Sequence, residues 1–550
     1  ASREVYEPKE TYRGYNANGI AEQQSRRSSS YSNENVLTYI KKIGQHSLNV
    51  MVGSSLLYEE NKTGSMTARD FISDVYGYNN LDAGAQWDKP NTGRSKSTLL
   101  SGFGRINYVL MDKYLFTVTG RADGSSKFGA NNKWAFFPSF AAAWRINQEK
   151  FMKNIDWISN LKIRGSWGVT GNQNIPAYSS PEKMNTYTYP IGGVTSVGIG
   201  AGNMPNPDLK WETTAITDIG IDLGVFNNRI NFTADYYYKK TTDLLWNISV
   251  PLTTGFGTVL KNIGSLQNKG LELSLSADVL TGPFKWNTML NWSTNKNKVL
   301  EIPGYIPTQQ GTISGHLKVN GSWLEPGLPV GVWNLLKTNG VMRTEKEWQD
   351  AARVADSNFD KIGDMSFVDK NGDGKISFGE DRQIVGDPNP DFIFGWTNNF
   401  SYKNFDLSVY INGSVGNDIY NVLRAETNIV SAWGNQRAEV KDRWTVNNPN
   451  GKYPRAHVLV NQNLLQSDYL IEDGSFLRIQ NVTLGYTFPK VSFLRSLRIY
   501  ATAQNLLTIT GYSGYNPEVN SQGQSNLQLG VDYNAYPTAR SFILGVNIGF

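Results

Sequence analysis

The segment 369–380, Asp-Lys-Asn-Gly-Asp-Gly-Lys-Ile-Ser-Phe-Gly-Glu, places oxygen-bearing side chains at regular intervals within twelve residues. It fits the pattern D-x-[DN]-x-[DN]-G-x5-E, in which a central glycine permits a sharp turn. Hard cations need a dense shell of oxygen ligands, and this spacing is typical of a calcium loop. The candidate ligands are the side chains of Asp369, Asn371, Asp373 and Glu380, the backbone carbonyl of Lys375, and Ser377 acting through water.

Alternatives to a calcium site stay open at this loop. The same residues could form an Asn/Asp/Gly turn without a metal, and magnesium is a weaker candidate because it prefers a small octahedral shell. Asp381 follows Glu380 directly, so it is a second candidate for the last ligand. Outside the predicted strands, Thr344–Val354 is the one segment whose sequence favours a helix. A paired, switching EF-hand domain is therefore not expected.

Other chemical motifs are sparse. The chain contains no cysteine, which excludes disulfides, thiolate chemistry and Cys-ligated metals. The three histidines, His46, His316 and His457, lack any metal-binding spacing and are interpreted as solvated or structural. The glycines of 198–202 lie in a long Asn/Gly-rich segment instead of between a strand and a helix, so a dinucleotide site is not predicted. No catalytic residue is proposed, and the chain is not expected to be an enzyme.

The composition favours a large all-β protein. Charged residues make up 18% of the 550 residues and aromatic residues 12%, with 53 glycines. A net charge of +5 spread over the whole chain is not the concentrated basic surface that nucleic-acid binding requires. No apolar run approaches the roughly 18 residues of a membrane-spanning helix. A β-barrel of an outer membrane fits this composition equally well, because its hydropathy signal is weak in each segment.

Alternation of apolar and polar residues predicts the strands that position these segments. In the last ten residues, Phe542, Leu544, Val546, Ile548 and Phe550 share one face, and Asn547 lies on the other. Similar alternation predicts about fifteen strands, near 33–41, 47–58, 97–109, 114–122, 134–146, 161–170, 213–225, 230–239, 269–280, 284–293, 391–401, 405–413, 475–488, 497–508 and 541–550.

The connections between these strands alternate between short and long. Short connections include 111–113, 226–229, 281–283 and 402–404, whereas 171–212, 240–268, 294–390, 414–474 and 509–540 are long. Outer-membrane barrels have short periplasmic turns and long extracellular loops in this order. We therefore predict an antiparallel transmembrane β-barrel whose C-terminus lies in the periplasm. The competing hypotheses are a secreted or surface-attached calcium-binding adhesin and a β-rich glycan hydrolase.

Several ordered sequence strings resemble the SusC/RagA family of TonB-dependent outer-membrane transporters from Bacteroidetes-type Gram-negative bacteria. They cover nearly the whole chain and include RADGSSKFG (121–129), GVTGNQ (168–173), NPDLKWETT (206–214), DYYYKKTTDLL (235–245), NKGLE (268–272), GDPNPD (386–391), FLRIQNVTLG (476–485) and LRIYATAQNL (497–506). The family's acidic loop often ends with Asp before Arg, whereas this chain has Glu380 and Asp381 before Arg382.

The resemblance implies a multi-pass barrel of about 22 strands around a plug. Residues 33–550 would be the C-terminal part of that barrel, 1–32 would be a loop or the continuation of an upstream segment, and the plug would be absent from this chain. It also implies import of oligosaccharides or oligopeptides, with a SusD-like surface lipoprotein, the TonB complex acting through the missing N-terminal part, and outer-membrane lipid as partners.

Overall fold

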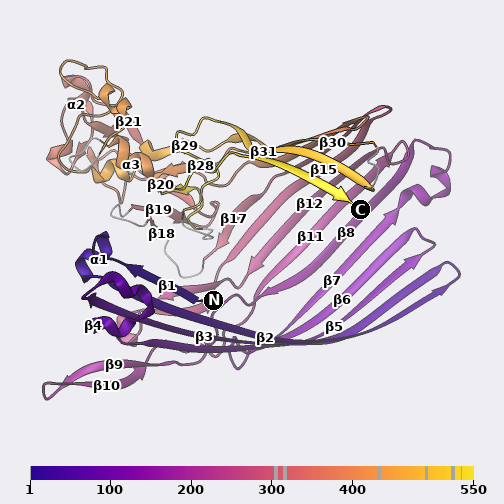
Figure 1. Ribbon diagram of the computed structural model, residues 1–550, viewed down its shortest axis with the longest axis horizontal. Coiled ribbons are helices and arrows are strands. Elements are labelled where there is room, and N and C mark those ends of the chain that lie inside the picture. Colours follow the sequence, from indigo (N-terminus) through magenta and orange to yellow (C-terminus); the bar gives the residue numbers. More distant parts are fainter. Residues whose placement is uncertain are drawn as a thin grey trace. The chain divides into compact units, whose positions relative to one another are not determined.

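The computed structural model describes residues 2–302, 308–313, 319–429, 435–489, 494–521, 527–533 and 535–550 (Figure 1). His316 lies outside these residues. Strands form at each place where the alternation predicted one, and their bounds are β2 (Ile20–Ile43), β3 (His46–Phe71), β5 (Asn91–Leu110), β6 (Tyr114–Ser125), β7 (Trp134–Arg145), β8 (Ile158–Asn172), β11 (Glu212–Val225), β12 (Ile230–Thr242), β15 (Ser265–Thr281), β16 (Phe284–Ser293), β26 (Phe392–Tyr402), β27 (Phe405–Val415), β30 (Phe476–Thr487), β31 (Ser496–Thr510) and β33 (Ser541–Gly549).

These strands and three shorter ones, β1 (Ser2–Glu7), β4 (Gly84–Trp87) and β17 (Lys296–Glu301), form an 18-stranded sheet among the described residues. The predicted all-β class is therefore confirmed. The chain divides into two compact units. Unit 1 comprises 1–143, 166–216 and 241–264, and unit 2 comprises 144–165, 217–240 and 265–550.

In unit 1, long strands pair without interruption. β2 has 24 residues and β3 has 26, and they pair from Ile20 opposite Arg69 to Ile43 opposite His46. β3 continues the pairing with β5. A transmembrane strand needs only ~9–11 residues. These strands are therefore long enough to extend well beyond a bilayer.

In unit 2, consecutive strands pair in the order β15, β16, β26, β27, β30, β31 and β33. Lys403, in the short turn between β26 and β27, has a φ of 54°. In unit 1, Met111 and Asp112 likewise have φ values of 56° and 55° in the turn between β5 and β6. Two consecutive positive φ values are the geometry of the tight hairpin turn whose twist matches the flanking strands.

The long connections contain structure that the alternation did not predict. Their strands are β9 (Met184–Ile191), β10 (Val194–Ala201), β13 (Leu245–Ser249), β14 (Thr258–Asn262), β18 (Thr308–Ile313), β19 (Val319–Leu324), β20 (Val332–Leu335), β21 (Thr338–Val341), β22 (Arg353–Val354), β23 (Met365–Phe367), β24 (Lys375–Ile376), β25 (Gln383–Gly386), β28 (Asp418–Asn421), β29 (Ile471–Asp473) and β32 (Val531–Asp532). The helices of these connections are α2 (Glu345–Asp350), α3 (Val422–Asn428) and α4 (Gln462–Leu465), and α1 (Tyr12–Ala17) lies between β1 and β2.

The helix expected within Thr344–Val354 is present as α2. The hydroxyl of Thr344 accepts a hydrogen bond from the backbone N–H of Glu347 at 3.2 Å and thereby caps the first turn. Within the described residues, no helix is both long enough and apolar enough to span a membrane.

The largest buried apolar cluster of unit 2 lies in the long connections instead of on the sheet. Its members include Trp333, Leu335, Tyr420, Leu464 and Leu470, each at most 2% exposed. Burial of large apolar side chains is the main source of folding free energy. The long connections of unit 2 therefore pack as folded structure with a core of their own.

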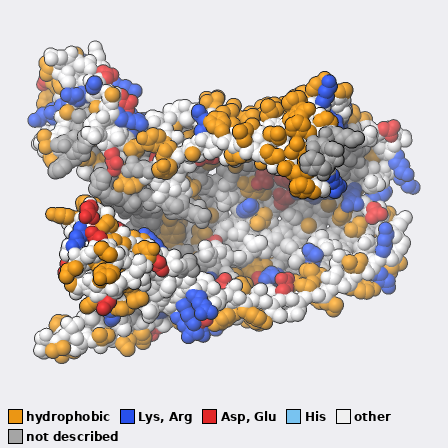
Figure 2. Space-filling view, viewed as in Figure 1, with side chains coloured by type: hydrophobic (Ala, Val, Ile, Leu, Met, Phe, Trp, Pro, Cys, Tyr) orange, Lys and Arg blue, Asp and Glu red, His pale blue; other side chains and the backbone are white. Residues whose placement is uncertain are grey.

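The C-terminal strand displays its apolar face. Phe542, Leu544 and Val546 are 74%, 85% and 56% exposed, and Ile548 and Phe550 are exposed as well. Asn547 pairs with Arg498 of β31, on the opposite, polar face. Figure 2 shows hydrophobic side chains gathered over the strands of unit 2. Water would disfavour such a continuous apolar surface, whereas lipid chains would not.

We therefore predict that a cation is tolerated on one face of β33 and not on the other. Val546→Arg should destabilise the folded protein by ~2–4 kcal/mol, because it places a charge in the lipid. Ile543→Arg should cost much less, because Ile543 shares its face with Thr502 of β31. Unfolding of the purified protein from lipid vesicles measures both changes, and equal costs would contradict the assignment of the two faces.

Candidate functional site

A cavity of about 830 Å³ lies against the polar face of the unit 2 sheet. Register places Ser274, Asn291, Gly395 and Asn412 side by side across β15, β16, β26 and β27. Directly paired residues project to the same face, so this row forms a polar floor. Segments of the long connections near Pro388 and Pro517 complete the lining.

The cavity offers many hydrogen-bonding groups beside aromatic rings. Its lining includes the carboxylates of Glu272 and Glu518, the amides of Asn291 and Asn412, and the phenol of Tyr410. The buried Oδ1 of Asn412 has no hydrogen-bond partner among the described residues. A buried acceptor without a partner costs free energy, so a ligand or water that donates to it would be stabilised.

Arg478 fixes one edge of the cavity. This β30 side chain is 4% exposed and donates to Thr508 Oγ1 at 3.0 Å and to Asn516 Oδ1 at 2.7 Å. It also forms an ion pair with Glu518. Charge-assisted hydrogen bonds are stronger than neutral ones. Arg478 therefore holds the segment 516–518 against the sheet, where that segment lines the cavity.

An ionic network joins three strands of the same unit. Arg164 of β8 contacts Asp218 at 3.2 Å and Asp222 at 3.5 Å, both in β11, and Asp235 of β12 at 2.5 Å. Lys162 contacts Asp222 at 2.6 Å. The sequence could not indicate that one arginine bridges three carboxylates on different strands. Asp235 also lines the cavity, so the network supports one of its walls.

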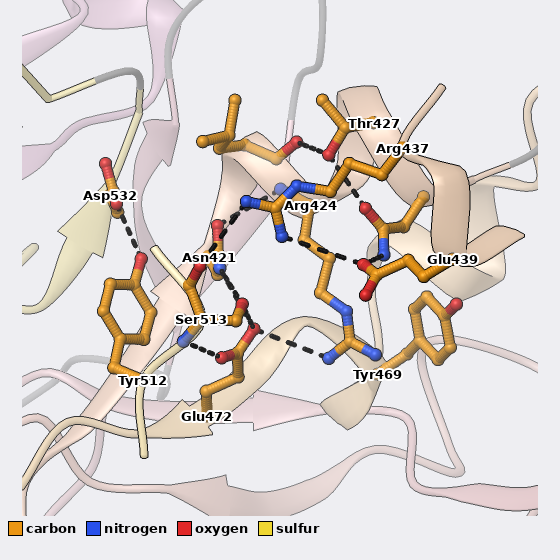
Figure 3. Close-up of polar contacts among 12 residues, drawn as sticks. Asn421, Arg424, Thr427, Arg437, Glu439, Tyr469, Glu472, Tyr512, Ser513 and Asp532 are labelled. Carbon is orange, nitrogen blue, oxygen red and sulfur yellow. Dashed lines mark hydrogen bonds and ion pairs between the residues drawn. The ribbon is translucent and has the colours of Figure 1, made fainter. Parts of the chain in front are cut away.

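A second polar network, drawn in Figure 3, joins separate long connections. Glu472 of β29 accepts hydrogen bonds from Asn421 Nδ2 at 3.0 Å and from the hydroxyl and the backbone N–H of Ser513, both at 2.9 Å. The guanidinium of Arg424 lies 3.6 Å from Glu472 and 4.8 Å from the ring centroid of Tyr469. Burial raises the pKa of Tyr469 to about 12. The network therefore ties β28, α3, β29 and the segment around Ser513 together.

The structure brings together part of the predicted cation loop. The side chains of Asn371 and Ser377 each lie 3.4 Å from Glu380 Oε2. Both carboxylate oxygens of Asp369 accept backbone N–H groups, from Gly372 at 2.7 Å and Gly374 at 2.8 Å. Asp373 accepts from the N–H of Lys375 at 2.8 Å, and Gly374 has a φ of 78°. In the described part of the chain, no cluster of three or more His, Asp or Glu side chains is close enough to hold a metal.

Asp381, the alternative last ligand, has a different structural position. It is completely buried, and its two oxygens accept the N–H groups of Lys370 at 3.0 Å and Ser377 at 2.7 Å. These bonds connect the beginning and the end of the loop. Asp381 therefore braces the loop, and its oxygens are already engaged by the backbone. Sequence spacing alone could not distinguish this role from that of a ligand.

Two histidines make structural contacts. His457 Nε2 lies 2.6 Å from the buried carboxylate of Asp364, which also accepts from Arg455 Nε at 2.8 Å. His46 Nδ1 lies 2.7 Å from the hydroxyl of Tyr108. These contacts agree with the structural interpretation of the two residues.

Comparisons with known proteins agree with this architecture. The family model described as "TonB dependent receptor-like, beta-barrel" matches residues 3–375. The chain is 36% identical over 556 residues to TonB-dependent receptor P3 of Formosa agariphila, covering 99% of this chain and 55% of the relative. It is 33% identical over 546 residues to TonB-dependent receptor SusC of Bacteroides thetaiotaomicron, covering 93% of this chain and 49% of the relative.

The fold has a close counterpart among solved structures. A structure of the RagAB peptide transporter superposes with a TM-score of 0.82 at 24% identity, over 97% of this chain and 56% of that chain. This chain spans about half the length of the curated relatives that it matches. The family model and the two relatives lead to one conclusion: the chain belongs to the TonB-dependent receptor family of the outer membrane, and its sequence matches the β-barrel of that family.

Proposed function

We propose that this chain forms the barrel wall of an importer for oligomeric nutrients. In this proposal a SusD-like surface lipoprotein captures the oligomer, the barrel receives it, and the TonB complex supplies the energy. The observation that carries the proposal is the cavity on the polar face of the unit 2 sheet. A cavity with convergent polar groups beside apolar surface is the usual form of a small-ligand site.

The substrate class is an oligosaccharide or an oligopeptide. Both carry many hydroxyl or amide groups, which the amides of Asn291 and Asn412 and the phenol of Tyr410 can pair. Similarity to the RagAB peptide transporter supports the peptide, and similarity to SusC leaves the glycan open. A secreted adhesin, the competing function, is less well supported, because the exposed apolar face of β33 suits lipid contact.

We further propose that the short turns face the periplasm and the long connections, including 294–390, face the outside. Hairpin connections of two and three residues join β2 to β3 and β5 to β6, whereas the opposite ends of the strands lead into the longer segments. In outer-membrane barrels the longer loops are extracellular. The core built by the long connections of unit 2 would then be a folded surface available to the lipoprotein.

The importer can be tested with the full-length protein, purified from outer membranes through an affinity tag. We expect a surface lipoprotein and a bound oligomer to co-purify, both identified by mass spectrometry. Replacing Asn291 and Asn412 by leucine should lower the amount of bound oligomer about tenfold, since each lost hydrogen bond costs ~0.5–1.5 kcal/mol.

The matched control changes the other face of the same strands. Leu290→Ile and Ile411→Leu leave the cavity unchanged, so their bound oligomer should equal that of the wild type. Absence of both a lipoprotein and an oligomer from the wild-type preparation would contradict the proposed function. If the double leucine variant retains the oligomer, the cavity is not the site at which the oligomer binds.

We also propose that the segment 369–380 binds calcium and stiffens the connection before β26. Its donors are carboxylate, amide, hydroxyl and carbonyl oxygens, the ligands that Ca²⁺ prefers. Ser377 Oγ and Asn371 Nδ2 each donate to Glu380 at 3.4 Å, which brings three of the six proposed ligand residues together. The Oδ1 of Asn371 accepts the backbone N–H of Asp373 at 3.1 Å. Binding would require Asp369, Asn371 and Asp373 to exchange backbone N–H partners for the metal, and the affinity should be modest, ~10⁻⁴–10⁻³ M.

Calorimetric titration of the purified full-length protein with calcium tests this site. Asp373→Ala should weaken binding by at least about tenfold, because the charge of the ligand set tunes the affinity. Asp350→Ala removes an equally exposed carboxylate from α2 and should leave the affinity unchanged. Wild-type protein that releases or absorbs no heat of calcium binding at millimolar concentration would show that the segment is only a turn.

A further inference from the structure

Three cations stand in a row on the outer face of unit 1. Arg27 of β2 lies directly opposite Lys62 of β3, and Lys62 lies directly opposite Arg94 of β5. Neither pairing contains a register shift, so residues two apart along these strands stay on the same face over the whole paired length. Figure 2 shows Lys and Arg side chains gathered over this part of the chain.

The same face carries the apolar surface of unit 1. Tyr31 lies opposite Tyr58, four residues along the strands from the row and toward the short turn. Further in the same direction, Leu37 lies opposite Val52 and Tyr39 lies opposite Val50. The other face carries polar rows, such as Asn49 opposite Asn107. The cation row therefore belongs to the face that meets lipid in an outer-membrane barrel.

The height of the row places it at the edge of the membrane. Leu48 and Tyr58 of β3 are ten residue steps apart, or ~33 Å along the strand, which a tilt of ~40° reduces to the ~25 Å of an apolar barrel belt. Lys62 lies four residues beyond Tyr58, ~13 Å along the strand and ~10 Å above the belt. The row is at the end of the strands opposite the short turns, so under the proposed topology it reaches the headgroups of the outer leaflet.

The charges of the row are not balanced by the protein. One carboxylate, Glu60, contacts Arg94 Nε at 2.5 Å and Lys62 Nζ at 3.9 Å. Its cross-strand neighbour is a further cation, Lys96. In the described chain no ion pair forms at Arg27, and the side chains of Lys62 and Arg94 are 51% and 57% exposed.

Like charges directly opposite each other destabilise a sheet. An external anion would remove this repulsion, and strands ~4.8 Å apart give the row a span of ~10 Å. Arginine forks and lysine are the side chains that bind phosphate most effectively. We propose that Arg27, Lys62 and Arg94, with Lys96, form a binding site for the phosphate groups of outer-leaflet glycolipid. A lipid is the favoured source because the row adjoins the apolar belt and faces away from the polar side of the sheet. The proposal rests on the barrel topology of the proposed function.

The site can be tested with diphosphorylated lipid A and the full-length protein in neutral detergent. We expect binding that raises the unfolding temperature, because a ligand of the folded state stabilises it. Replacing Arg27, Lys62 and Arg94 together by glutamine should weaken the affinity roughly 100-fold, given the contribution of each cation near an anionic surface. Dephosphorylated lipid A should bind the wild type as weakly as diphosphorylated lipid A binds this triple variant.

Two control variants show whether an effect comes from the row itself or from the change in total charge, and a gel assay shows whether each variant is folded. Lys89, Lys183 and Lys261 are exposed and scattered over unit 1, so replacing all three by glutamine removes the same charge and should leave the affinity unchanged. The exchange variant Arg27→Lys, Lys62→Arg and Arg94→Lys keeps the charges and should bind within about threefold of the wild type. Heat-modifiable gel migration reports whether each variant is folded.

Three results would overturn the lipid site. One is a folded triple glutamine variant that binds lipid A as tightly as the wild type, and another is equal binding of dephosphorylated lipid A. The third is full competition by inorganic phosphate at equal phosphate concentration, which would make the row a site for soluble anions. The triple glutamine variant should still co-purify with the lipoprotein and oligomer, so failure of the lipid site and failure of the importer are distinguishable.

Discussion

A peptide group in lipid must find its hydrogen-bond partner within the protein, and the rest of this structure depends on that constraint. Each unsatisfied group would cost several kcal/mol, so strands at that depth must pair along their whole length. The pairing of β2 with β3 and of β3 with β5 shows this most clearly, because it continues without a register shift. Once every residue is committed to a ladder, its side chain has only two directions available, and alternate residues take opposite faces.

The two faces then acquire different chemistry. One face carries Phe542, Leu544 and Val546 in β33, and the other carries the carboxylates and amides that line the cavity of unit 2. Strand pairing fixes the positions of the backbones in the sheet. The chemistry of the cavity is therefore set by the polar side chains that the strands carry. Arg164 bridges three carboxylates across neighbouring strands, and Arg478 fixes the segment that closes one edge of the cavity. The long connections of unit 2 pack around a core of their own.

The sequence predicted the strands well and the site only in part. Period-two alternation located each main strand, but it placed the start of β2 near residue 33, whereas the strand begins at Ile20. Residues 22–30 are polar on both faces, so they give no apolar signal, although pairing with β3 extends the strand through them. The cation loop was recognisable because its ligands are close in sequence. The cavity was not, because Asp235, Asn291, Asn412 and Glu518 meet only through register and long-range folding. The bracing role of Asp381 likewise depends on backbone contacts that spacing does not reveal.

Which face of a strand meets lipid can be measured directly. Nitroxide spin labels placed one at a time along residues 48–53 of β3, in the full-length protein in lipid bilayers, report collisions with oxygen and with a water-soluble nickel complex. If the even-numbered face of β3 meets lipid, oxygen accessibility is high at Leu48, Val50 and Val52 and low at the intervening positions, with a period of two. Uniform accessibility along the strand, or the opposite phase, would contradict the assignment of this chain to a membrane-spanning wall with a polar interior.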